Sequence, residues 1–183
     1  VIPATASEAP YILDGLLMND AGRHIREQFT DTGGFTDHVF AACAILGYRF
    51  APRIRDLPSK RLYAFNPSAA PAHLRALIGG KVNQAMIERN WPDILRIAAT
   101  IAAGTVAPSQ ILRKLASYPR QNGVAAALRE LGRLERTLFT LNWIDDPELR
   151  RTTEVVERLG EELERDPRML LFGKKTGRAG PGE

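Results

Sequence analysis

Residues 30–40 decide how the surrounding chain is organised, and they read Thr30-Asp31-Thr32-Gly33-Gly34-Phe35-Thr36-Asp37-His38-Val39-Phe40. Residues 24–30 alternate well enough to predict a β-strand that leads into this stretch. The two adjacent glycines interrupt the strand. An apolar periodicity over residues 36–47 then predicts a helix, with Gly47 just past its end. A strand, a glycine turn and a helix in this order indicate an α/β region.

The chain as a whole divides into four predicted regions. A short helix is predicted from Pro10, and strands over 48–54 and 61–65. Residues 71–141 predict helices separated by turns, and Asp146-Pro147 is typical of a helix start. The predicted fold class is therefore α/β and mostly helical. Its regions are an α/β region (1–65), a helical region (66–145), a C-terminal helix (146–172) and a basic, Gly-rich, disordered tail (173–183).

The helical region and the C-terminal helix each have apolar positions at helical spacing, and we expect these positions to be buried. They are Ile94, Leu95, Ala98 and Ile101; Ile111, Leu112 and Leu115; Val124, Leu128, Leu131 and Leu138; and Leu149, Val156, Leu159 and Leu163.

Composition narrows the class of protein. The chain has 183 residues, with 25 basic and 21 acidic side chains, and its net charge of +4 mildly favours a polyanionic partner such as DNA. The single cysteine, Cys43, is expected to be a core residue in a reducing compartment. We expect no membrane span, since no apolar run is long enough, and no signal-peptide pattern is present. A cytoplasmic location is therefore expected. A first residue of Val1 suggests that the chain begins inside a longer reading frame.

Asp31 is the first candidate for chemistry. It follows a predicted strand and precedes two glycines, and reactive groups gather at the carboxyl ends of strands in α/β folds. A carboxylate there could hold Mg²⁺, which prefers oxygen ligands. The alternative is an aspartate that satisfies backbone N–H groups in a turn. Asp-Thr-Gly also occurs in aspartic proteases, but those proteins are mostly β.

Basic side chains form a second candidate site. Arg129, Arg133 and Arg136 are spaced for one helix face, opposite the leucines, and a DNA backbone would favour such a stripe. Arg113, Lys114 and Arg120 precede them in the chain. The alternative is a solvated face, in which these arginines pair with Glu130 and Glu135.

Two further candidates have strong structural alternatives. Glu161 belongs to an acidic helix stripe with Glu154, Glu157 and Glu164, so it is either a solvated residue or a metal ligand. His38 could also be a ligand, although Thr36-Asp37-His38 is typical of a capped helix N-terminus.

Several longer motifs resemble the catalytic region of the Tn-three-family replicative transposases, which are DDE transposases. The stretch at residues 30–40 carries the resemblance first. It continues in Tyr48-Arg49-Phe50-Ala51-Pro52-Arg53-Ile54-Arg55-Asp56-Leu57, in Leu112-Arg113-Lys114-Leu115-Ala116-Ser117-Tyr118-Pro119-Arg120-Gln121-Asn122-Gly123, and in Ala127-Leu128-Arg129-Glu130-Leu131-Gly132-Arg133. Glu8-Ala9-Pro10-Tyr11 and Leu13-Asp14-Gly15-Leu16-Leu17 also fit. The motifs are collinear and cover about residues 1–151.

The resemblance implies a partial RNase H-like fold with an all-helical insertion. It implies metal-dependent cleavage and transfer of DNA strands, with two Asp and one Glu that hold two Mg²⁺ ions. Expected partners are DNA (transposon ends and target), and an intact transposase or a second copy of the chain. The expected location becomes the bacterial cytoplasm, in association with the nucleoid.

The resemblance places Asp31 as the second catalytic acid. The third falls on Glu161, which is 130 residues further on, although the family's run Asn-Lys-Gly-Glu-Ala-Arg-Asn is not retained around it. The family's first acid lies upstream of the residues in this chain. We therefore expect a transposase fragment that is inactive alone. The alternatives are a DNA-binding remnant and a helical partner of an intact transposase.

Overall fold

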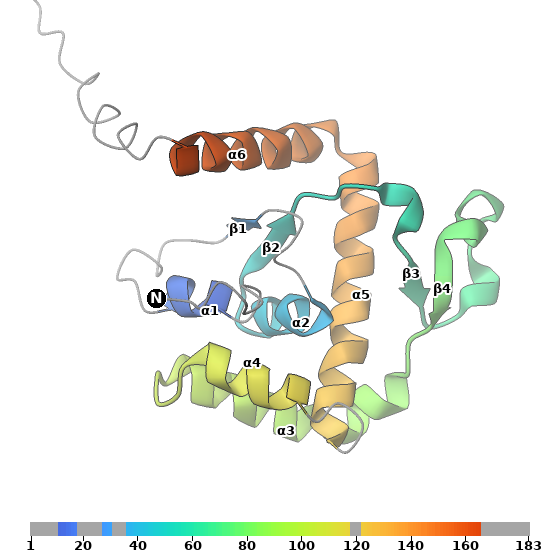
Figure 1. Cartoon of the computed structure of the whole chain (residues 1–183). Helices are drawn as coiled ribbons and strands as arrows, with labels where there is room; N and C mark the ends of the chain where they lie inside the picture. The colour runs from blue at the N-terminus through green and yellow to red at the C-terminus, as the bar shows by residue number, and fades with distance from the viewer. Residues whose placement is uncertain (1–10, 18–26, 31–35, 118–121, 166–183) are drawn as a thin grey trace, which may run out of the picture.

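The computed structural model describes residues 11–17, 27–30, 36–117 and 122–165, and the chain in these ranges is mostly helical with two small parallel sheets (Figure 1). The N-terminal part contains α1 (Ile12–Leu17), β1 (Glu27–Thr30), α2 (Asp37–Ile45) and β2 (Arg49–Pro52). It is followed by short 3₁₀ turns, by β3 (Leu62–Ala64) and by β4 (Ile78–Lys81). Four long helices complete the chain: α3 (Gln84–Ala102), α4 (Pro108–Ser117), α5 (Gly123–Asp145) and α6 (Pro147–Arg165).

The first sheet pairs β1 and β2 in parallel, with α2 as the connection between them. Their register places Glu27 opposite Arg49 and Thr30 opposite Pro52, so the two strands end together. Helix α2 begins after Thr36, whose hydroxyl accepts a hydrogen bond from the Val39 N–H. It ends before Gly47, which adopts a φ of +81° that a side chain would disfavour.

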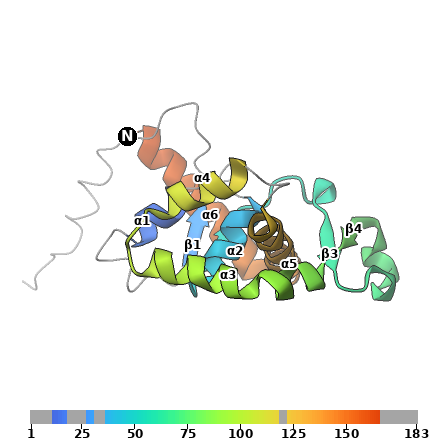
Figure 2. The ribbon, with the colours of Figure 1, turned by 90° about the horizontal axis from the view of Figure 1, so that it is seen from below.

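Helix α5 is the centre of the packing. It lies between α2 on one side and the β3–β4 pair on the other, as both views show (Figures 1 and 2). At the crossing with α2, a Cβ on Gly132 would overlap the backbone carbonyl of Asp37. Gly132 therefore permits a close approach of the two helices. The core around α2 includes Phe40, whose ring meets Phe50 edge-on at 4.9 Å and lies 5.8 Å from Phe139.

Several expectations are confirmed by these elements. The helix after Pro10, the helix over 36–47 and the strands within 48–54 and 61–65 are all present. Asp146 caps α6 by accepting hydrogen bonds from the N–H groups of Glu148 and Leu149. Cys43 is fully buried, which raises the pKa of its thiol to about 12. The predicted first strand is described only from Glu27 onward, and the predicted tail over 173–183 lies outside the described residues.

Two expectations are wrong. The region over 66–145 is not all helical, because it contains β4, which pairs with β3 of the preceding region. The apolar faces are also misassigned in part: Leu95 is 50% exposed, Leu138 is 48% exposed and Leu159 is 47% exposed. Val156 is also exposed, and α6 buries the predicted Leu149 but then Thr153 and Glu157 in place of Val156 and Leu159. The side chain of Leu163 lies outside the described part of the structure. Among the residues that the structure describes, no helix is long and apolar enough to cross a membrane.

Candidate functional site

The candidate site begins where β1 and β2 end. Thr30 is the last residue of β1, and its carbonyl accepts a hydrogen bond of 3.1 Å from the N–H of Arg53, the first residue after β2. Asp31 follows Thr30 in the chain and lies outside the described residues. The carboxyl edge of a parallel strand pair is where α/β folds place ligands.

Helix α6 packs against β1, although more than a hundred residues separate them in the chain (Figure 1). This brings the helix that carries Glu161 beside the strand that leads to Asp31. The Glu161 carboxylate is about half exposed, and it lies 3.7 Å from Arg55 Nη2 and 3.8 Å from Arg165 Nη2. Both of its ion-pair partners in the described part of the chain are therefore arginines.

Glu157 is a buried acid of this helix, with a side chain only 4% exposed. It forms an ion pair with Arg53, and its Oε1 accepts a hydrogen bond of 2.6 Å from Arg55. Sequence reasoning assigned Glu157 to a solvated acidic stripe. No spacing in the sequence links residues 53–55 to residue 157, so this three-residue contact could not be predicted.

A groove of about 390 Å³ runs beside this contact. Its lining has nearly balanced charges, and the residues are Arg53, Arg151, Glu154, Val155, Glu157, Arg158 and Glu161. Because Glu157 and Glu161 both lie against guanidinium groups, the groove presents no concentration of negative charge of the kind that attracts a divalent cation.

The predicted DNA-binding arginines of α5 take part in internal ion pairs. Arg136 Nη1 lies 3.0 Å from Asp37 Oδ1, and Arg133 Nη1 lies 2.6 Å from Glu130 Oε1. Both guanidinium groups also stack near the Tyr63 ring, and both side chains are only about a quarter exposed. These contacts hold α5, α2 and β3 together.

The predicted basic residues of α4 are placed differently. Arg113 and Lys114 are exposed, and Arg113 donates a hydrogen bond of 3.2 Å to the Tyr11 hydroxyl beside α1. Arg129 is partly buried on α5, and Arg120 lies outside the described residues. Arg113 contacts Tyr11 beside α1, whereas Arg133 contacts Tyr63 of β3. Because α1 and β3 lie on opposite sides of α5 (Figure 1), the structure does not bring these two arginines into one stripe.

His38 takes part in a contact between α2 and α5. Its Nε2 lies 3.1 Å from the Ala125 carbonyl oxygen of α5, so the neutral imidazole donates a hydrogen bond there. Burial lowers the pKa of His38, although that hydrogen bond and the nearby Asp37 oppose the shift. Within the described ranges, no group of three or more His, Cys, Asp and Glu side chains could hold a metal ion.

A family model and several known proteins match this chain, and all of them are transposases or a transposase domain. The model of the Tn3 transposase DDE domain family matches residues 1–179. The chain is 49% identical over 174 residues to the transposase for transposon Tn501 of Pseudomonas aeruginosa, which covers 95% of this chain. It is 48% identical to the transposase for transposon Tn21 of Escherichia coli, and 42% identical over 175 residues to that for transposon Tn1546 of Enterococcus faecium. The chain spans about 18% of the length of these relatives.

Proposed function

The chain belongs to the Tn3 transposase DDE domain family, and on this premise we propose that it supplies part of the catalytic domain of a transposase. In this proposal the reaction is cleavage and transfer of DNA strands during transposition. Asp31 and Glu161 are two of the three catalytic acids, in a partial RNase H-like fold. The partners are transposon-end and target DNA, and an intact transposase or a second copy of the chain.

One observation carries the proposal: α6 packs against β1. Strand β1 runs directly into Asp31, and Glu161 lies on the helix beside that strand. Glu161 thereby lies on a helix that packs against the strand preceding Asp31, although the two acids are 130 positions apart in the sequence.

The family implies a divalent metal, and we assign Mg²⁺ to Asp31 and Glu161 as part of this proposal. When bound, Mg²⁺ would supply charge stabilisation at a phosphodiester. The described residues do not by themselves fit such an ion, because Glu161 lies against Arg55 and Arg165, and the other acids of its groove lie among arginines. For that reason we expect the 183-residue chain alone to leave DNA uncut in Mg²⁺ or Mn²⁺.

Metal binding tests the assignment of the two acids. Mn²⁺ would be titrated into the chain, with the free ion followed by electron paramagnetic resonance. Asp31→Asn and Glu161→Gln should each weaken Mn²⁺ binding several-fold, whereas the control Glu162→Gln on the neighbouring residue should not. Equal binding by the Glu161 and Glu162 variants would remove Glu161 from the site.

DNA binding without cleavage is a second candidate function, and the exposure of Arg113 and Lys114 on α4 favours it. Arg120, Arg129, Arg133 and Arg136 belong to the same proposal as neighbours in the chain. Binding of this kind should weaken steeply as salt rises and should change little with DNA sequence. Removing both exposed charges should lower the salt dependence, and an unchanged salt dependence would count against this function.

A further inference from the structure

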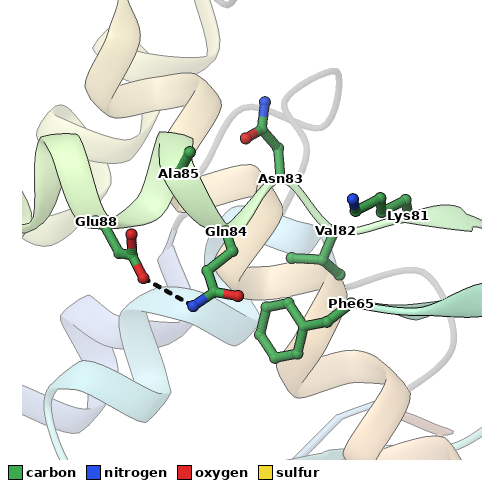
Figure 3. Close-up of a pocket in the computed structure, with 7 residues that line it drawn as sticks. All are labelled: Phe65, Lys81, Val82, Asn83, Gln84, Ala85 and Glu88. Carbon is green, nitrogen blue, oxygen red and sulfur yellow. Dashed lines mark hydrogen bonds between the residues drawn. The ribbon is translucent and has the colours of Figure 1, made fainter.

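A second hollow lies at the carboxyl ends of β3 and β4, remote in the chain from the proposed acids. It has a volume of about 680 Å³, within the range of small-ligand sites. Figure 3 shows its lining, which comes from the residue after β3, from the end of β4 and from the first turns of α3: Phe65, Lys81, Val82, Asn83, Gln84, Ala85 and Glu88.

The aromatic ring is the first notable feature of this hollow. Phe65 directly follows β3 and is 44% exposed, although folded proteins usually bury such a ring. Figure 3 shows the ring beside Val82, which is fully buried and follows β4. One side of Phe65 is thus supported by the core, while much of the ring remains accessible.

Polar groups with unused hydrogen-bonding capacity line the same hollow. The side-chain oxygen of Asn83, Oδ1, caps α3 by accepting a hydrogen bond from the Met86 N–H, and Asn83 Nδ2 has no partner among the described residues. Gln84 Nε2 donates to Glu88 at 2.7 Å, and within the same described ranges Gln84 Oε1 has no donor. Lys81 is exposed and takes part in no ion pair with the residues that the structure describes.

The backbone of this hollow is held in place from the core. The N–H of Asn83 donates a hydrogen bond of 2.9 Å to Oε2 of Glu130, a buried residue of α5 whose other oxygen pairs with Arg133. The turn from β4 into α3 is therefore tied to the central helix. A ligand would meet donors and acceptors that are already positioned, which lowers the cost of binding.

We propose that this hollow binds an unpaired nucleobase, with its ring stacked on Phe65 and its phosphate near Lys81. A nucleobase offers a π-face for the phenyl ring and a polar edge for the Gln84 amide, which lies beside the ring in Figure 3. The adjoining phosphate is an anion that suits an unpaired ammonium group. Aromatic stacking beside a cation is the usual basis of binding to single-stranded nucleic acid. The inference rests on DNA as the partner in the proposed function, but it requires neither metal nor the acids.

Two probes separate the base from the backbone: a short oligothymidylate, and the same oligonucleotide with abasic sites. Binding is measured without divalent metal. Phe65→Ala should weaken binding of the oligothymidylate roughly 5- to 100-fold. It should leave the abasic probe unaffected, and Phe65→Trp should retain binding because it keeps an aromatic face. Trp91→Ala is the matched control, since Trp91 on α3 is another exposed aromatic residue, with 40% exposure.

Lys81→Gln provides an independent check. It should weaken both probes equally and reduce the salt dependence of binding by about one phosphate contact. The proposal is overturned if Phe65→Ala loses no more affinity than Trp91→Ala, if it loses equally on both probes, or if the unaltered chain binds neither. Because no metal is present, such a failure leaves the Mn²⁺ test of Asp31 and Glu161 unaffected.

Discussion

At the scale of single residues, the crossing of α5 over α2 depends on Gly132. Any Cβ at this position would overlap the Asp37 carbonyl, which belongs to a helix backbone and cannot turn aside. We predict that Gly132→Ala lowers the free energy of unfolding by at least about 2 kcal/mol. The loss would be measured by urea denaturation followed by circular dichroism.

Gly160 supplies the control, because it also lies inside a helix but has open space around its Cα. Gly160→Ala should therefore stabilise the chain by about 0.5–1 kcal/mol, since alanine loses less backbone entropy in a helix. Equal effects at the two positions would show that helix propensity alone, and not the close approach to Asp37, explains Gly132.

His38 gives the fold a pH dependence. Burial lowers the pKa of the folded imidazole below the value of about 6.5 that an unfolded chain has. The unfolded state therefore binds the proton first as the pH falls. The stability that His38 contributes is present above about pH 6.5 and is lost as the pH falls through the folded pKa.

We predict that His38→Gln reduces the difference between the free energies of unfolding at about pH 7.5 and about pH 5.5. The amide can still donate to the Ala125 carbonyl, but it does not titrate in this range. Urea titrations at the two pH values would measure the difference. A difference of unchanged size would mean that other groups cause the pH dependence.

At the scale of elements, local signals predicted most helices and strands, because caps, glycines and apolar spacing act within a few residues. Thr36 and Asp146 cap helices as expected, and Gly47 follows a helix end. Strand β4 was missed, because Ile78–Lys81 contains two glycines and its pairing with β3 is set by tertiary contact. The contact between Arg53 and Glu157 could not be predicted from the sequence either, since it depends on how α6 packs.

Helix α6 shows the same limit on its buried face. Periodicity predicted that Leu149, Val156 and Leu159 face the core, but the helix turns Thr153 and Glu157 inward after Leu149. The ion pairs of Glu157 with Arg53 and Arg55 explain why this face of α6 is buried. An apolar pattern alone cannot show that a carboxylate has partners on another element.

Substitutions on α6 test which face is buried. Leu149→Ala should cost about 2–4 kcal/mol in the free energy of unfolding, because its side chain is 6% exposed and packs in the core around α2. Leu159→Ala should change stability by less than about 0.5 kcal/mol. Denaturant titrations of both variants would decide the matter, and a larger loss at Leu159 would contradict the packing of α6 on β1.

At the scale of the whole molecule, the sequence resemblance and the fold support different parts of the candidate site. The resemblance identified the family and named Asp31 and Glu161, which no local pattern could separate from a turn residue and a solvated acid. The packing of α6 beside β1 adds a physical reason to consider the two together. The arginines of α5 form ion pairs with acids of the same chain, which is evidence against one continuous basic stripe for DNA.

The most direct test is a chimera in which this chain replaces the matching segment of the transposase for transposon Tn501, to which it is 49% identical. Transposition frequency would be measured for the chimera and for its Asp31→Asn, Glu161→Gln and Glu162→Gln variants, with protein amounts checked by immunoblotting. We predict transposition by the chimera and by the Glu162 variant, and a loss of at least about a hundredfold for the other two. Transposition that survives Glu161→Gln as well as it survives Glu162→Gln would contradict the account.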